Sequence, residues 1–364
     1  MKRAHQPDPE ELRNTMADKP MAQQAAQAVP SGGAVRRASL SVHIMRFREL
    51  GLLGFVVLLA LLVQWRNPSF LTLENINDLL RNAAILSILA LGMMLVIVTR
   101  GIDLSIGATL ALSGMITALT VSANPGMHPM AALLLGTAIG LACGSLLGWF
   151  VARLGILPII ATLGMMNVFR GLTFTISGGK WVSAHQMPDS FTGIATGSIL
   201  GINTLIFIAI VAYAVFHYFV NHTRTGRQIY AVGSNPEAAV ISGIPKERLL
   251  WLVYAIMGAL SGLCGVLWVA KFASAQGDTA MGYELTVIAA CVLGGVSIAG
   301  GVGKVSGVLV GSLLIGMLNN ALPLLNVSPF WQTAIQGGII LLAVLANVWV
   351  KRSVDRNHLL RRRI

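Results

Sequence analysis

The sequence predicts an all-α integral membrane protein of about ten transmembrane helices in two loosely repeated halves. Of its 364 residues, 55% are hydrophobic and 11% are charged, whereas soluble domains carry about 25% charged residues. Apolar runs long enough to cross a lipid bilayer recur along the chain. The formal net charge is +12, but the basic residues lie at the ends of these runs rather than on one face. This distribution favours membrane topology over nucleic-acid binding.

Three regions follow from this composition. Residues 1–42 are polar, with charges of both signs, which is typical of a disordered tail. Residues 43–350 form the predicted transmembrane domain, and 351–364 are a tail with six Lys and Arg residues. The first apolar run has no small-residue cleavage site after it, so we expect an uncleaved signal anchor.

The first half of the domain contains five expected spans. The first starts behind Arg46 and Arg48, and the polar, amphipathic residues 70–82 after it are expected to lie at the membrane interface. Four glycines recur at intervals of four residues in the fourth span, which lets another helix approach closely; they are Gly136, Gly140, Gly144 and Gly148. The five spans are 50–65, 83–98, 104–121, 130–151 and 156–176.

The second half contains five more expected spans. A polar segment, 177–198, precedes them, and the longest polar interval of the domain, 221–249, separates the first two. The third and fourth are short, so either could be a half-helix. The five spans are 199–220, 250–270, 285–299, 305–322 and 330–350.

The charge distribution predicts the orientation. Ten spans place both termini on the same side of the membrane. If that side is the cytoplasm, the cytoplasmic segments, both tails included, hold 21 of the 26 Lys and Arg residues. Basic residues accumulate on the cytoplasmic side of membrane proteins, so we expect both termini and the interval 221–249 to be cytoplasmic.

Each half contains a Gly-rich, broken segment. The first is TRGIDLSIGATLALSG (99–114) and the second is LGGVSIAGGVGKVSG (293–307). Interrupted apolar segments at matching places in two halves indicate a transporter's substrate path. The alternative is that these glycines serve only close helix packing.

Asp103 lies in the first of these segments. A charge at the centre of a bilayer costs roughly 2.5–3.5 kcal/mol, so Asp103 is expected at a helix end or in a wet cavity. There it can cap the next helix, with Ser105 close by, and Arg100 can pair with it. Either this is a charged cytoplasmic turn or its groups face the translocated solute.

Uncharged polar residues within apolar runs are further candidates for the translocation path. They suit a neutral polyhydroxyl solute better than an ion, although hydrogen bonding between helices is their simplest role. No paired carboxylates or His relay occur in the spans, which weakens an ion-coupled mechanism. The candidates are Asn167, Asn319 and Gln336, beside Asp103 and Ser105.

The interval 221–249 contains a signal for a short helix outside the bilayer. Asn235 can cap it, Pro236 can be its first residue and Glu237 lies in its first turn. Gly243 and Pro245 end it. A short capped helix held outside the membrane predicts a partner that grips it from the cytoplasm.

The spacing Glu-Ala-Ala-x-x-x-Gly over 237–243 resembles the coupling loop of ABC importer permeases. Together, AVGSNPEAAVISGI (231–244) and TRGIDLSIG (99–107) make residues 50–350 resemble the ribose/xylose-type monosaccharide permease family. The resemblance implies a pair of identical or different permease subunits in a bacterial inner membrane. It also implies a cytoplasmic ATPase and a periplasmic solute-binding protein. The ATPase contact would come from Glu237, Ala238, Ala239 and Gly243.

The sequence contains no nucleotide-binding motif G-x-x-x-x-G-K-[ST]. We therefore expect no cofactor, metal or catalytic site in this chain, and ATP and Mg on the partner ATPase. Cys143, Cys264 and Cys291 have no metal or disulfide spacing and are expected to be packing residues. Three alternatives remain, namely a branched-chain amino acid ABC permease, an ion-coupled secondary transporter, and a membrane-embedded enzyme or scaffold.

Overall fold

The computed structural model describes residues 51–328 and, beyond them, residues 331, 334–335, 337–338, 341 and 345. The predicted disordered tail, the basic tail and most of the last expected span therefore lie outside the described residues. The first nine expected spans, apart from residue 50, lie within the described residues.

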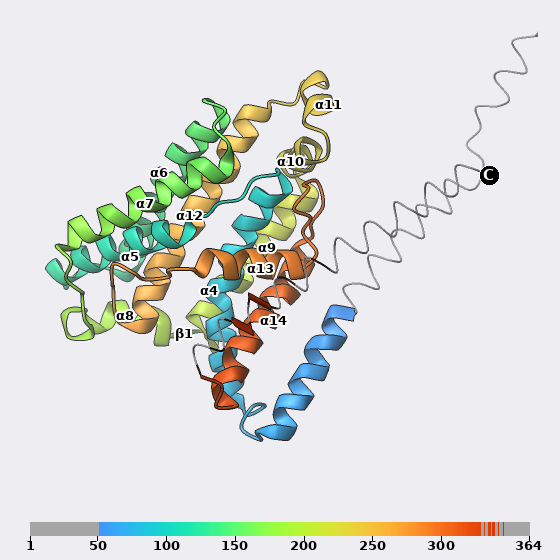
Figure 1. The fold of residues 1–364 in the computed structure, drawn as a ribbon. Helices are drawn as coiled ribbons and strands as arrows, with labels where there is room; N and C mark the ends of the chain where they lie inside the picture. Colours follow the sequence, from blue (N-terminus) through green and yellow to red (C-terminus); the bar gives the residue numbers. More distant parts are fainter. Residues whose placement is uncertain are drawn as a thin grey trace, which may run out of the picture. The chain divides into compact units, whose positions relative to one another are not determined.

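The described part of the chain is almost entirely helical (Figure 1). Its strands are two short segments, β1 (Ser198–Ile199) and β2 (Ile202–Asn203), paired antiparallel. The first helix is Gly51–Arg66. The others are α4 (Leu73–Val98), α5 (Ile106–Ala123), α6 (Pro129–Ala152), α7 (Pro158–Ser177), η2 (Ala184–Gln186), α8 (Asp189–Thr196), α9 (Thr204–His222), α10 (Arg224–Ser234), α11 (Pro236–Ile241), α12 (Lys246–Phe272), α13 (Tyr283–Leu293) and α14 (Val305–Leu324).

Helix α4 is the central element of the core. Every residue from Ala83 to Val98 is buried, because α9, α12, α13 and α14 all pack against it. A helix that is apolar on every side belongs in such an interior position. The predicted division into an interfacial helix over 70–82 and a span over 83–98 is wrong. One helix begins at Leu73, where the Thr72 hydroxyl accepts a hydrogen bond from the Asn75 N–H at 3.4 Å.

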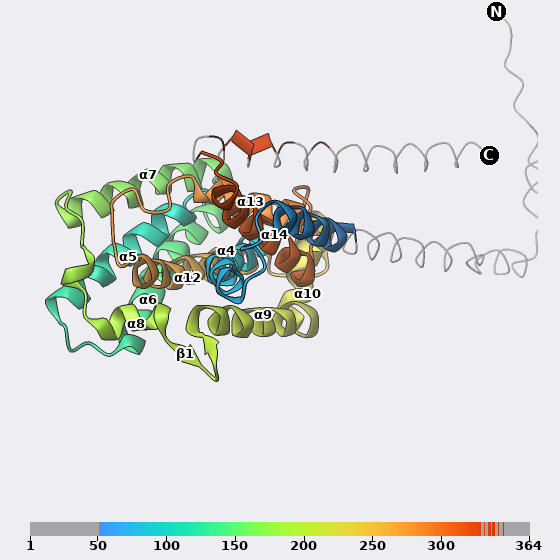
Figure 2. The ribbon, with the colours of Figure 1, turned by 90° about the horizontal axis from the view of Figure 1, so that it is seen from below.

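Close packing of α6 against α12 confirms the glycine stripe. A Cβ added at Gly140 would lie 2.6 Å from the Gly262 Cα, and one added at Gly144 would lie 2.7 Å from the Gly258 Cα. The absence of side chains at these positions lets the two backbones touch. Viewed from below, α12 lies between α6 and α4, so this contact joins the outer helices to the core (Figure 2).

Seven helices in the described part are long and apolar enough to cross a membrane, and two apolar helices are shorter. This agrees with a polytopic membrane protein, but it does not confirm the count of ten spans. Helix α13 has 11 residues and is about 16 Å long, half the thickness of a bilayer core. The following helix, α14, has 20 residues, so only the first of the two short spans is a half-helix.

The spanning helices differ in how far the molecule itself covers them. In α4, 89% of the most apolar window is buried, compared with 22% in α7 and in α9. The exposed apolar side chains of α7 and α9 are suited to lipid or to another subunit. The three cysteines are buried and free, which confirms their prediction as packing residues.

Candidate functional site

The polar interval between α9 and α12 folds into two helices rather than the single short one expected. The Thr223 hydroxyl accepts a hydrogen bond from the Gly226 N–H at 3.0 Å and starts α10. Its buried residues, Gly226, Ile229, Val232 and Gly233, recur every three or four positions. This is the pattern of a helix with one apolar face, so the sequence carried a signal for α10 that the expectation missed.

Helix α11 follows the predicted caps closely. The Asn235 side chain accepts a hydrogen bond from the Ala238 N–H at 3.0 Å, and Pro236 is the first helical residue. After the last turn, Gly243 adopts a φ of 75°, a left-handed conformation that favours glycine. The Ile244 N–H then donates to the Ala239 carbonyl at 3.0 Å. The chain therefore turns sharply into α12.

The residues exposed on α11 are only in part those that the resemblance implies for the ATPase contact. Ala239 is only 4% exposed and packs into the core, whereas Glu237 and Ala238 are exposed. Val240 is 54% exposed and Ile241 is 87% exposed. We call Glu237, Ala238, Val240 and Ile241 the tip. Its two apolar members were missed, because a helical pattern alone does not tell which face of a six-residue helix is covered.

The end of α10 is fixed to the end of α4 by Arg100. The Arg100 guanidinium donates from Nε to the Gly233 carbonyl and from Nη2 to the Ser234 carbonyl, each at 2.7 Å. These are the last carbonyls of α10, where a cation is favoured by the helix dipole. The predicted pairing of Arg100 with Asp103 is therefore wrong. Arg100 itself has a φ of 66°.

The Gly-rich connection between α13 and α14 meets the same point. The Gly301 N–H donates to the Val98 carbonyl at 2.8 Å. A Cβ added at Gly233 would lie 2.8 Å from the Gly301 nitrogen and still closer to the Val98 oxygen. We call this junction of Val98, Arg100, Gly233, Ser234 and Gly301 the base. It joins α10 to the central helix and to the α13–α14 connection, and Figure 1 shows α10 and α11 together beyond the end of α4.

The two broken segments thus meet at the base, but Asp103 lies a few residues further on, in the connection before α5. Its Oδ1 accepts hydrogen bonds from the Ser105 N–H at 2.8 Å and from the Ser105 hydroxyl at 2.7 Å. These bonds close a local turn before α5, but Ser105 is the N-cap of that helix and no side chain caps it. The predicted capping of the helix by the Asp103 carboxylate is therefore wrong, whereas the predicted closeness of Ser105 is confirmed. Both residues are buried, and burial raises the pKa of the Asp103 carboxyl to about 6, while the bonds from Ser105 oppose that rise.

The other candidates for the translocation path lie on other elements than Asp103. Asn167 is exposed on α7, and its side chain donates to the Leu163 carbonyl at 3.0 Å. Asn319 is partly buried near the end of α14, and Gln336 lies outside the described residues. A path through these residues therefore stays a prediction.

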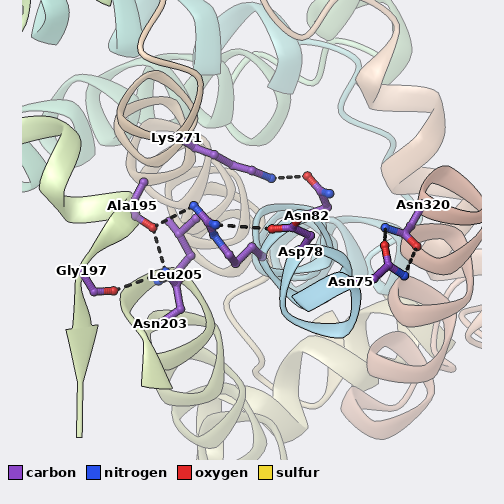
Figure 3. A network of polar contacts seen from close by, with 10 residues as sticks. Asn75, Asp78, Asn82, Ala195, Gly197, Asn203, Leu205, Lys271 and Asn320 are labelled. Atoms are coloured by element: carbon purple, nitrogen blue, oxygen red, sulfur yellow. Dashed lines mark hydrogen bonds and ion pairs between the residues drawn. The ribbon is translucent and has the colours of Figure 1, made fainter. Parts of the chain in front are cut away.

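Polar contacts also gather at the opposite end of α4 (Figure 3). Asn75 and Asn320 exchange two side-chain hydrogen bonds of 3.0 Å between α4 and α14. This is the inter-helix bonding expected for polar groups within spans. Arg81 pairs with Asp78 at 3.5 Å and donates to the Ala195 carbonyl, and the Lys271 ammonium donates to Asn82. These contacts hold α4, α8, α12 and α14 together.

A buried central helix, long apolar helices around it and a polar helical segment outside them are the architecture of a polytopic membrane protein. In sequence, residues 75–344 match the family described as branched-chain amino acid transport system / permease component. The chain belongs to this family.

Individual curated proteins are also similar to the chain. The chain is 40% identical over 301 residues to the ribose import permease protein RbsC of Escherichia coli K12, covering 82% of this chain and 93% of that protein. It is 41% identical to the RbsC of Bacillus subtilis over 296 residues, 81% and 90% of the two chains. It is 40% identical to the L-arabinose ABC transporter permease protein AraH of Azospirillum brasilense over 280 residues, 76% and 81%. No solved structure matches the chain.

Proposed function

We propose that this chain is the permease subunit of an ATP-driven ABC importer that moves a neutral sugar or sugar-like solute across the bacterial inner membrane. The observation that carries the proposal is the contrast within α11. The helix is anchored through Ala239 and the base, yet it exposes Val240 and Ile241 in the interval between the spanning helices α9 and α12. Exposed apolar side chains on a fixed helix are suited to a protein partner.

In this proposal the tip lies in a groove of the ATPase, and the base carries its movement into the membrane. A displacement of α11 moves the end of α10, because Asn235 joins the two helices directly. The Arg100 hydrogen bonds then pass the displacement to α4, and the Gly301–Val98 bond passes it to the connection before α14. ATP-driven closure of the ATPase would thereby change the access of the solute path from one side to the other.

Two further partners are those that the family resemblance implies. A second permease subunit, identical or different, completes the membrane part, and a periplasmic binding protein delivers the solute. Both termini and α11 are placed on the cytoplasmic side, as the distribution of basic residues predicts. ATP and Mg bind to the ATPase subunit, since the sequence of this chain has no phosphate-binding loop.

A sugar is favoured over a branched-chain amino acid as cargo, although the family description names the latter. The curated relatives include permeases for ribose, L-arabinose and D-allose, at 36–41% identity.

The test is uptake of radiolabelled ribose, arabinose and leucine by cells that produce the chain together with the proposed ATPase and binding protein. We expect uptake of a sugar that stops on ATP depletion and persists when an uncoupler collapses the proton gradient. Glu237→Lys should abolish uptake and co-purification of the ATPase while the protein stays in the membrane. Uptake that survives ATP depletion but not the uncoupler would establish an ion-coupled transporter instead.

A further inference from the structure

A hollow of about 280 Å³ lies between the end of α6 and the start of α12. Two tryptophan rings line it, and they remain open to binding, since Trp149 is 47% and Trp251 is 42% exposed. Three charged side chains and one alanine complete its wall, namely Arg153, Glu247, Arg248 and Ala152. Tryptophan and arginine are enriched among the residues that dominate the binding energy of protein interfaces. The composition of the hollow is therefore suited to a protein partner.

The walls of the hollow are fixed by the close contact of α6 with α12. A Cβ added at Gly148 would lie 3.1 Å from the Trp251 Cα, so the two backbones approach closely here. The Trp251 indole N–H donates to the Ser145 carbonyl at 3.1 Å. Arg153 pairs with Glu247 at 2.9 Å across the two helices. A partner would find this shape already formed, which lowers the entropy that is lost on binding.

Arg248 is the cation of this wall without an acidic partner. The charge of Arg153 is compensated by Glu247, whereas Arg248 is exposed and forms no ion pair within the described residues. The hollow thus offers one uncompensated positive charge beside two aromatic rings. A partner segment with a carboxylate next to an apolar side chain complements it, since the charge attracts the acid and the rings cover the apolar group.

The hollow adjoins the tip. Helix α11 contacts α12, and α11 and the start of α12 lie at the same end of the helical bundle (Figure 1). The six residues from Ile241 to Glu247 can span at most about 22 Å.

The tip alone is too small for a stable interface. It has four residues, whereas a stable protein interface takes about 800 Å² and roughly 20–30 residues from each partner. A circular patch of that area is about 32 Å across, which is wide enough to include both the tip and the hollow. A partner that binds stably at the tip therefore needs neighbouring surface, and the hollow is within reach.

We propose that the hollow is a second docking point for the ATPase, which places an acidic side chain beside Arg248 and an apolar one against Trp149 and Trp251. This inference rests on the proposed function, because it names a further contact of the same partner. One short helix leaves a partner free to rotate, whereas a second contact on α6 and α12 fixes its orientation. It also gives the ATPase a direct contact with the outer helices, besides the route through α11 and the base.

The test places a photo-cross-linking amino acid at one position of the full-length chain, in cells that also produce the proposed ATPase. In place of Trp149 it should form a covalent adduct with the ATPase. The matched control is Leu134, which is 63% exposed near the other end of the same helix and should give no adduct. In place of Ile241 at the tip, the adduct is expected from the proposed function alone.

Charge reversal tests the expected carboxylate. Arg248→Glu should weaken the binding of the ATPase to the purified protein about tenfold, because it sets one acid against another. Arg248→Lys keeps the charge and should weaken binding less. Arg224→Glu reverses an exposed charge of the same interval that does not line the hollow, so binding should stay within about twofold of the wild type. The melting temperature should not change in any of the three, since both arginines are exposed.

The outcomes separate this inference from the transport proposal. An ATPase adduct from Ile241 without one from Trp149 would overturn the second docking point and leave the transport proposal standing. Lipid adducts alone from Trp149 would overturn it in the same way and assign the two tryptophans to the membrane interface. Equal binding of the ATPase by Arg248→Glu and the wild type would also overturn it. If neither position gave an ATPase adduct, both proposals would fall.

Discussion

The tip follows Gly233 and Ser234 of the base by only a few residues, but the tip and the base differ in how far the chain itself covers them. At the base, Gly233 lies against the backbone of Val98 and Gly301, and Arg100 is hydrogen-bonded to two carbonyls. At the tip, Ile241 is 87% exposed, and an added Cβ at Gly243 would meet nothing within 4 Å. The base has its contacts within the chain, whereas the tip exposes apolar side chains, which we propose as the contact with the ATPase.

This difference separates two ways in which a variant can stop transport. A change at the base should weaken the fold and the connection of α10 to α4 together. A change at the tip should leave the fold intact and remove only the partner. The melting temperature of the purified protein in detergent measures the effect of each variant on stability.

The largest effect is expected for Gly233→Ala. The added Cβ would press on the Val98 carbonyl and lie 2.8 Å from the Gly301 nitrogen, so the backbone itself has to move. Overpacking of this kind costs about 1–3 kcal/mol, and the melting temperature should fall. The matched control is Gly164→Ala in α7, where nothing lies within 4 Å of the added atom. There alanine should be neutral or raise stability by up to about 1 kcal/mol.

If Gly233→Ala and Gly164→Ala melted at the same temperature, the close approach at the base would be wrong. The sequence alone does not distinguish these two glycines, because each lies within a helix. It does predict the glycine stripe of α6, since four residues at regular spacing define one face. Gly233 has no such companion on α10, and its packing depends on Gly301, which is distant in sequence.

A second, smaller loss is expected for Arg100→Gln. The variant removes charge-assisted hydrogen bonds to the last two carbonyls of α10, which are worth about 1–2 kcal/mol when partly exposed. The protein should still fold, but uptake should fall while the ATPase stays bound, because α10 is no longer held to α4. Arg153→Gln is the control, since its 2.9 Å pair with Glu247 is exposed and contributes less than about 1 kcal/mol.

Full uptake by Arg100→Gln would show that the base does not transmit movement. The sequence spacing predicts Asp103 as the partner of Arg100, because that acid is only three positions away. Local spacing does not show that the end of α10 lies closer. The contact of Asp103 with Ser105 was predictable, since it depends on neighbours in the chain, although the carboxylate does not cap α5.

The third prediction concerns Gly243, which links the tip to α12. Its φ of 75° costs a β-branched residue about 1–2 kcal/mol and costs asparagine less. Gly243→Val should therefore lower the melting temperature modestly and Gly243→Asn only slightly. Since no atom lies within 4 Å of an added Cβ, equal effects of the two variants would mean that backbone conformation is not the reason for glycine here.

The smallest effect on stability, with the largest on assembly, is expected for Ile241→Asp. An exposed substitution changes the free energy of unfolding by about 0.5 kcal/mol or less, so the melting temperature should stay the same. Co-purification of the ATPase should be lost, because a charge would enter an apolar contact. The matched comparison is Ala239→Asp, which introduces the same charge at a buried position of the same helix. It buries a charge at a position that is 4% exposed, so it should destabilise the fold itself.

The pair of variants decides whether the tip is a docking surface or a part of the fold. If Ile241→Asp lowers the melting temperature as much as Ala239→Asp, Ile241 is covered within the protein and the tip is not a free surface. If Ile241→Asp leaves both stability and ATPase binding unchanged, the partner binds elsewhere and the Glu-Ala-Ala spacing only shapes the helix. Loss of the ATPase at unchanged stability is the one result that requires a partner on the exposed face of α11.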